Sequence, residues 1–308
     1  MKKMFVFIII LPFMLFSQNL SVSSIEQVTT LEQGSFHYPQ FSNNGSKILF
    51  TTVSYQGLWL YSFDGASIKK INEHVGSGYE PVFSEDDTQI IFRNDEYSYG
   101  GRKSSLRTYD IYSQTESIIK DFTRDLSAPI KSISNEVVYL NNYLPESFSL
   151  SENRVIESYA NQAPIVFIEN TNLVLFHNGE KKVLNPAGKG SYIWASLSPD
   201  NTKILFRVAA KNTYITDLTG NIIAEFGYAN APVWSPDGNW IAYMQDMDNG
   251  EVVTSSDIFI ASADGSFHLN LTNNPDLKGM YPSWSSQGDK IVFSTYEGVI
   301  YTINLMTE

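Results

Sequence analysis

The chain has 308 residues, contains no cysteine, and carries 21 basic against 33 acidic side chains, a formal net charge of −12. Because nucleic-acid phosphates attract basic surfaces and repel acidic ones, this balance argues against nucleic acid as a partner and against simple adsorption to anionic lipid. Without disulfides, the folded protein must be stabilised by its hydrophobic core.

The first residues have the layout of a secretory signal peptide. Two lysines precede the continuous apolar run of residues 4–16, which Ser17 and Gln18 end. The run is shorter than the roughly 20 apolar residues of a membrane-spanning helix. We therefore expect residues 1–18 to be removed on export, residues 19–308 to form one domain, and the protein to be periplasmic or secreted without a membrane span.

A short pattern then recurs along the chain. Its copies begin at Pro39, Pro81, Pro129, Ala195, Pro232 and Pro282. Each copy ends a first strand on an apolar or aromatic residue and Ser, turns through Asn, Asp or Gly, and starts an almost continuously apolar second strand. Asn, Asp and Gly tolerate the positive φ of tight hairpins, and a continuously apolar strand suits a sheet covered on both faces. Two further strands follow in most copies, so each repeat predicts one four-stranded propeller blade.

The spacing of the copies predicts the number of blades. One blade takes roughly 40–50 residues, and the interval from Pro129 to Ala195 is too long for one. Its strand-like runs and a second start near Ala163 and Pro164 indicate two compact blades. We therefore predict an all-β protein, a single propeller of seven four-stranded antiparallel blades, with six as the alternative. A strand at residues 26–30 is expected to complete the last blade and close the ring.

The clearest copy resembles a known repeat. The frame P-x-W-S-P-D-G-x-x-I-A-Y at residues 232–243 and its continuation to Leu271 and Thr272 resemble the TolB-like, WD-repeat-like propeller repeat of exported bacterial proteins. The resemblance is weakest over residues 127–190. It implies the fold and leaves the function open, because such blades occur in binding scaffolds, in caps of serine peptidases and in oligogalacturonate lyases. TolB carries an α/β domain before its propeller, whereas the first copy here follows the signal almost directly, so a role in the Tol-Pal system is not expected.

Signatures of catalysis are scarce in this sequence. It contains no G-x-S-x-G, no H-E-x-x-H and no Gly-rich phosphate loop, and the repeated Ser-Pro-Asp-Gly is typical of hairpin turns. The lyase resemblance implies a histidine and metal cluster, for which His37, His74, His177 and His268 are too few. We therefore predict no catalytic residue and no metal site. A lyase-like enzyme, or a cap for a separately encoded enzyme, remains the alternative.

An acidic segment at residues 246–251 is the one candidate cofactor site in the sequence. It offers several oxygen ligands over a short span but departs from the EF-hand spacing. A calcium ion is one interpretation and a solvated acidic loop is the favoured one, so no cofactor is predicted.

Aromatic and charged residues gather in loops that a propeller places on one face. The long connections at residues 93–105 and 244–256 are expected to be irregular loops of functional importance. The candidate binding residues are Arg93, Asp95, Tyr97, Tyr99, Arg102, Tyr192, Trp194, Tyr228 and Tyr281. The same loops hold Tyr38, Tyr55, Tyr79, Arg207, Asp246 and Tyr296. Because such rings stack on sugars or anchor peptides, we expect a monomeric, non-catalytic scaffold that binds an envelope or secreted protein, a peptide or a glycan.

Overall fold

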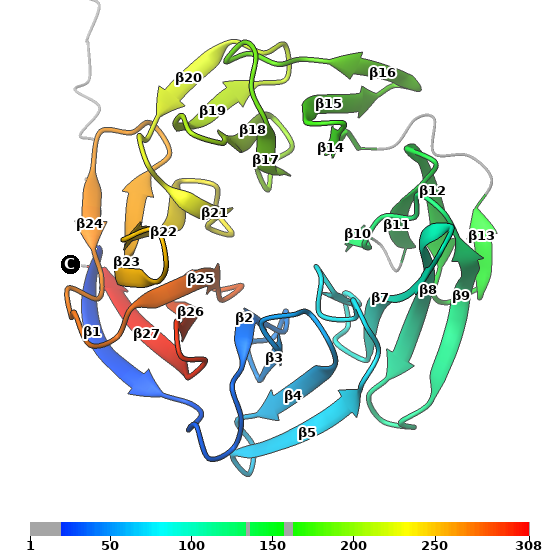
Figure 1. Ribbon diagram of the computed structural model, residues 1–308, viewed down its shortest axis with the longest axis horizontal. Helices are drawn as coiled ribbons and strands as arrows, with labels where there is room; N and C mark the ends of the chain where they lie inside the picture. Colours follow the sequence, from blue (N-terminus) through cyan, green and yellow to red (C-terminus); the bar gives the residue numbers. More distant parts are fainter. Residues whose placement is uncertain (1–19, 134–135, 157–162, 308) are drawn as a thin grey trace, which may run out of the picture.

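The computed structural model describes residues 20–133, 136–156 and 163–307, which form a ring of seven antiparallel sheets around a central channel (Figure 1). The seven-bladed propeller is therefore confirmed, including the extra blade that begins just after Ala163 and Pro164. The predicted signal segment lies outside the described residues. Within the described ranges, no helix is long and apolar enough to cross a membrane.

Each blade runs outward from an innermost strand beside the channel. Blades 1 to 3 comprise β2 (His37–Phe41), β3 (Lys47–Thr51), β4 (Leu58–Ser62), β5 (Ser67–Asn72); β6 (Val82–Phe83), β7 (Gln89–Ser98), β8 (Gly101–Asp110), β9 (Glu116–Thr123); and β10 (Ile130–Ile133), β11 (Glu136–Asn141), β12 (Leu144–Ser149), β13 (Arg154–Ile156). Blade 4 has three described strands, β14 (Ile165–Glu169), β15 (Asn172–His177) and β16 (Glu180–Val183).

The remaining blades have four strands each, and blade 7 takes its fourth from the start of the chain. Blades 5 to 7 comprise β17 (Tyr192–Leu197), β18 (Lys203–Val208), β19 (Thr213–Asp217), β20 (Ile222–Glu225); β21 (Asn230–Trp234), β22 (Trp240–Asp248), β23 (Val253–Ser262), β24 (His268–Asn270); and β25 (Gly279–Trp284), β26 (Lys290–Thr295), β27 (Ile300–Thr307) with β1 (Leu20–Gln27).

The second strand of each blade is almost continuously apolar because neighbouring blades cover both of its faces. In β3, Ile48 and Phe50 pack with residues of blade 7, whereas Leu49 packs with Ile90 and Phe92 of blade 2. Successive side chains of a strand point to opposite faces, and both faces of this sheet are covered by a neighbouring blade. The ring is therefore one continuous series of cores between blades.

An N-terminal strand closes the ring, as predicted, but it starts earlier in the chain than the expected residues 26–30. It is β1, which pairs antiparallel with β27 from Leu20↔Thr307 to Gln27↔Tyr301. Its apolar side chains Leu20, Val22 and Ile25 pack against the core between blades 6 and 7. A bulge between Val22 and Ser24 interrupts the two-residue alternation, which is why the pattern does not show in the sequence.

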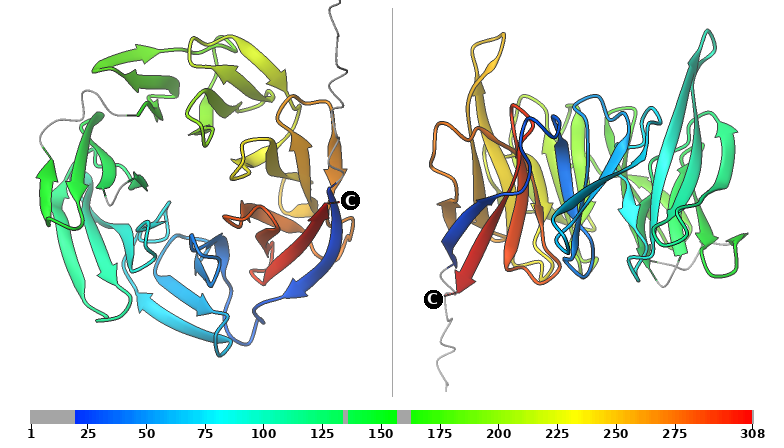
Figure 2. Two further views of the ribbon diagram at one scale, coloured as in Figure 1. Left: turned by 180° about the vertical axis from the view of Figure 1, so that it is seen from behind. Right: turned by 90° about the horizontal axis from the view of Figure 1, so that it is seen from below.

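The long connections at residues 93–105 and 244–256 are regular hairpins, and the prediction of irregular loops was wrong. β7 and β8 stay paired as far as Ser98↔Gly101, and β22 and β23 as far as Asp248↔Val253. Both hairpins project from the same face of the ring, on opposite sides of it (Figure 2). Their outer halves lie beyond the packed blades, so they carry polar residues and show no apolar alternation, while the ladder still satisfies the backbone.

Candidate functional site

The innermost strands share a bulge at the end that faces the two hairpins. The residue at the position before the repeat proline has a positive φ in five blades: Tyr38 (53°), Glu80 (51°), Trp194 (51°), Ala231 (44°) and Tyr281 (53°). In four of them, the pairing with the second strand shifts at this point. A bulge redirects a side chain, and a left-handed conformation costs a residue other than glycine about 1–3 kcal/mol. Aromatic residues in such positions mark a candidate functional site.

Four tyrosines form a continuous row at this end of the channel. The ring centroids of Tyr281 and Tyr38 are 4.2 Å apart, those of Tyr38 and Tyr55 are 4.4 Å apart, and Tyr55 meets Tyr79 edge to face at 5.3 Å. We call Tyr281, Tyr38, Tyr55 and Tyr79 the tyrosine arc; it extends from blade 7 across blade 1 to blade 2. Burial raises the pKa of Tyr38 and of Tyr281, so their hydroxyls stay protonated at neutral pH. The arc therefore offers ring faces and neutral hydroxyls together.

A buried ion pair supports the blade 2 end of the arc. The Arg93 guanidinium lies 4.9 Å from the centroid of the Tyr79 ring, and its Nε is 2.8 Å from Asp95 Oδ1. A second nitrogen of Arg93 donates to Asp95 Oδ2 at 3.1 Å, and Ser104 Oγ donates to Oδ1 at 2.6 Å. Burial lowers the pKa of Arg93, and the charge of Asp95 opposes that shift. Both side chains are almost fully buried, so they position Tyr79 and the base of the β7–β8 hairpin.

A second arginine lies near the other end of the arc, between blades 5 and 6. The Arg207 guanidinium stacks 4.6 Å from the centroid of Tyr228, whose hydroxyl donates to Asp246 Oδ2 at 3.3 Å. Asn230 Nδ2 donates to Asp246 Oδ1 at 2.6 Å. Asp246 in turn contributes, after burial, to the raised pKa of Tyr281. Blades 5 and 6 thus hold a second group of aromatic and charged residues, made of Arg207, Tyr228, Asn230 and Asp246.

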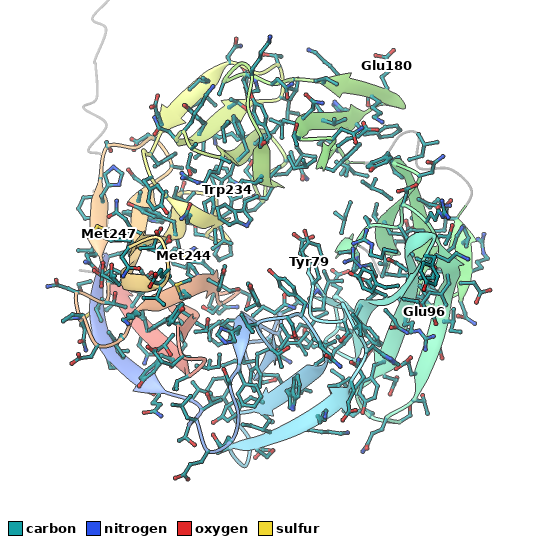
Figure 3. All side chains as sticks on the ribbon, viewed as in Figure 1. Tyr79, Glu96, Glu180, Trp234, Met244 and Met247 are labelled. Atoms are coloured by element: carbon teal, nitrogen blue, oxygen red, sulfur yellow. The ribbon has the colours of Figure 1, made fainter. Side chains whose placement is uncertain are left out.

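The blade 2 end of the tyrosine arc opens into the central channel, which has a volume of about 1840 Å³. Tyr55, Tyr79, Glu80, Arg102 and Trp194 are among its lining residues. Figure 3 shows Tyr79 at the inner rim of the ring, with Trp234 across the opening from it. The mouth thus combines exposed ring surface with the carboxylate of Glu80 and is open to a partner.

The predicted binding residues occupy three kinds of environment. Tyr97, Tyr99 and Arg102 are exposed on the outer part of the β7–β8 hairpin, and Trp194 and Tyr228 are partly exposed near the mouth. Tyr281 belongs to the tyrosine arc, and Arg93 and Asp95 are the buried pair beneath it.

Tyr192 differs from the other candidate aromatic residues because its side chain is buried. Its hydroxyl donates to the carbonyl of Gly188 and accepts from the amide of Ala187, both at 2.9 Å. Tyr192 therefore holds the preceding loop in place. Sequence reasoning missed Glu80, although its position directly before Pro81 in the repeat is a signal that finds it.

The histidines lie apart from the channel. His37 is buried beside Ser35, His74 pairs with Glu116, and His268 lies beside the Tyr243 hydroxyl; none of the four histidines lines the channel. In the acidic turn, Asp248 accepts from the amide of Gly250 and Asp246 is held by Asn230. Over the described ranges, no three His, Cys, Asp or Glu side chains come together as a group that could hold a metal ion.

No protein-family model and no curated protein sequence matches this chain. Among solved structures, it is similar to U3-55K, with a TM-score of 0.65 and 12% identity over 93% of this chain and 100% of the other. It is also similar to an oligogalacturonate lyase from Vibrio parahaemolyticus, with a TM-score of 0.61 and 11% identity over 93% and 96% of the two chains. TolB from Acinetobacter baumannii matches with a TM-score of 0.47 and 20% identity over 77% of this chain and 54% of its own. At these identities, the similarity shows the propeller fold alone.

Proposed function

We propose that this protein is an exported, non-catalytic scaffold that captures a protein or peptide partner at the channel mouth on the hairpin face. The observation that carries the proposal is the tyrosine arc. Tyr38, Tyr55 and Tyr281 all have left-handed backbones, although tyrosine gains nothing locally from that conformation. Strain of this kind collects at binding and catalytic sites.

The shape of the face supports capture of a macromolecule. The β7–β8 and β22–β23 hairpins stand on opposite sides of the mouth, so a partner that contacts the arc lies between them (Figure 2). Tyr97 and Tyr99 are exposed on one hairpin, and Met247 and Val252 on the other. Tyr and Arg dominate the binding energy of protein interfaces, and Met adapts to varied surfaces. The signal-like N-terminus supports a partner in the periplasm or outside the cell.

Replacing Tyr97, Tyr99 and Arg102 together by Ala is expected to reduce capture of the partner from an envelope extract by about tenfold or more, because such residues contribute roughly 2 kcal/mol each at interfaces. All three are exposed, so the unfolding free energy should change by less than about 1 kcal/mol. The measurement is a quantitative pull-down with the purified exported chain as bait, paired with thermal unfolding.

Tyr112→Ala is the matched control, because Tyr112 is equally exposed but lies in the turn after β8, at the opposite end of that strand from the hairpin tip. It should capture the partner as the parent does. Equal yields from the triple variant and the parent would exclude the hairpin as a binding element.

We also expect no turnover of pectic oligosaccharides that depends on the histidines, with or without added divalent metals. His37 is buried and His74 is paired with Glu116, and neither faces the channel. The measurement is the release of unsaturated products by the parent, by His37→Ala and by His74→Ala. Turnover in the parent that either substitution abolishes would contradict the scaffold and favour a lyase.

A further inference from the structure

Glu80 is a carboxylate at the channel mouth that the fold leaves without a partner. Over the described part of the chain, its side chain forms no hydrogen bond, and no cationic group lies within ion-pair distance of it. It is accessible to solvent and lines the channel. The wall around it nevertheless removes part of its hydration, which raises the pKa of Glu80, while the charge of Arg93 opposes that rise.

The backbone directs this carboxylate toward the mouth at a cost. Glu80 has a φ of 51°, and the equivalent position holds Tyr38 and Tyr281 in blades 1 and 7, where the side chain joins the tyrosine arc. A left-handed conformation is uncommon for glutamate and is retained only where the surrounding structure imposes it. Blade 2 thus presents a carboxylate at the position where blades 1 and 7 present rings.

Two rings of the tyrosine arc accompany that charge. Tyr79 directly precedes Glu80 in the chain, and Tyr55, Tyr79 and Glu80 all line the channel. In keeping with this placement, the charge of Glu80 raises the pKa of Tyr79 and contributes, after burial and other groups, to the raised pKa of Tyr55. Tyr55 and Tyr79 contact each other edge to face. A carboxylate beside aromatic rings is the arrangement that binds an ammonium or guanidinium group through charge pairing and cation–π attraction.

The two nearby arginines, Arg93 and Arg102, do not neutralise the Glu80 carboxylate. Arg93 is compensated by its two contacts with Asp95. Arg102, whose charge acts on both Tyr79 and Arg93, is exposed on the hairpin, where water and salt screen its charge. The net charge of −12 of the whole chain draws basic partners toward it.

From this geometry we propose that Glu80, Tyr55 and Tyr79 form a subsite for the cationic side chain of a lysine or arginine in a partner peptide. The subsite rests on the proposed capture function and specifies the chemistry of what is captured. The ligand is a peptide segment because the arc continues through Tyr38 to Tyr281 and so offers ring faces for neighbouring side chains as well.

The probe is a fluorescein-labelled Gly-Ser peptide with two lysines, together with the same peptide carrying both lysines acetylated, each titrated into the exported chain by fluorescence anisotropy. The parent should bind the lysine peptide about tenfold more tightly than the acetylated one, since hydrogen bonds to charged groups are worth about 1.5–3 kcal/mol. Glu80→Gln should remove most of that difference, and Tyr79→Leu should weaken binding several-fold.

Glu85→Gln is the matched control. Glu85 is an exposed carboxylate of the same blade that lines the same channel, but it lies in the turn after β6, at the far end of that strand from Glu80. Its substitution removes the same charge and should change the affinity less than about twofold, as expected of a screened surface charge.

Equal affinities of the parent and Glu80→Gln, or equal affinities for the two peptides, would overturn the subsite. The capture function is decided separately. One outcome is that the protein binds the lysine peptide and its acetylated form equally, while the variant lacking Tyr97, Tyr99 and Arg102 still loses its partner in the pull-down. That result would contradict the subsite and leave the proposed capture function standing.

Discussion

Deleting residues 20–27 is expected to destroy the monomeric fold. β1 completes blade 7, and its removal exposes the edge of β27 together with the core that Leu20, Val22 and Ile25 cover. Each such side chain contributes up to about 1.5–3 kcal/mol when fully buried, so the loss approaches the whole stability of an ordinary domain, about 5–15 kcal/mol. The bare edge then becomes a template for pairing with other chains. Size-exclusion chromatography and thermal unfolding measure both effects.

Point variants separate closure from a general failure to fold. Ile25→Asp places a charge against the core and should lower the unfolding free energy by about 2–4 kcal/mol. Ser23→Asp makes the same charge change at the exposed bulge residue and should cost less than about 1 kcal/mol. A deletion variant that stays monomeric and melts with the parent would show that β1 does not close the ring.

Replacing Asp95 by Ala is expected to cost about 3–5 kcal/mol of unfolding free energy. The substitution leaves the Arg93 guanidinium buried without its carboxylate, and an uncompensated buried charge is far more costly than the loss of an exposed pair. Ser104 loses its acceptor as well. Denaturant unfolding monitored by the intrinsic fluorescence of the five tryptophans is the measurement.

Glu96→Ala is the control for that variant, since Glu96 is the next residue of the same hairpin and is exposed. It should cost less than about 0.5 kcal/mol. The double variant Arg93→Leu/Asp95→Leu should be more stable than Asp95→Ala, because it removes both charges at once. If Asp95→Ala unfolds within about 1 kcal/mol of the parent, the pair does not stabilise the base of the hairpin.

Deletion of residues 20–27 and the Asp95→Ala substitution should affect the channel mouth differently. Asp95 acts on the site through Arg93 and Tyr79, all in blade 2, so its loss should disturb one end of the tyrosine arc. β1 acts through blade 7, which it completes and whose Tyr281 meets Tyr38 of blade 1. The site therefore depends on ring closure as much as on any single blade.

The sequence by itself determined the strands that pack inside the blades, the hairpin turns at the repeats and the number of blades. Hairpin glycines such as Gly45, Gly238 and Gly288 all have a positive φ, as their turn positions predict. The apolar second strands are buried on both faces, and seven repeats give seven blades. These features are local, because side-chain periodicity and turn chemistry act within a few residues of the chain.

Only the tertiary structure decided what stands at the mouth. Tyr38 and Tyr281 meet because the ring closes, and no local pattern records that the first and last blades are neighbours. The same holds for burial: Tyr192 and Tyr281 both belong to innermost strands, yet Tyr192 is buried and bonded to the preceding loop, whereas Tyr281 joins the arc. The outer parts of the two hairpins have no core to pack on, so they lack the apolar alternation by which strands are recognised. Which rings gather, and which carboxylate lacks a partner, follows from contacts between blades that are distant in sequence.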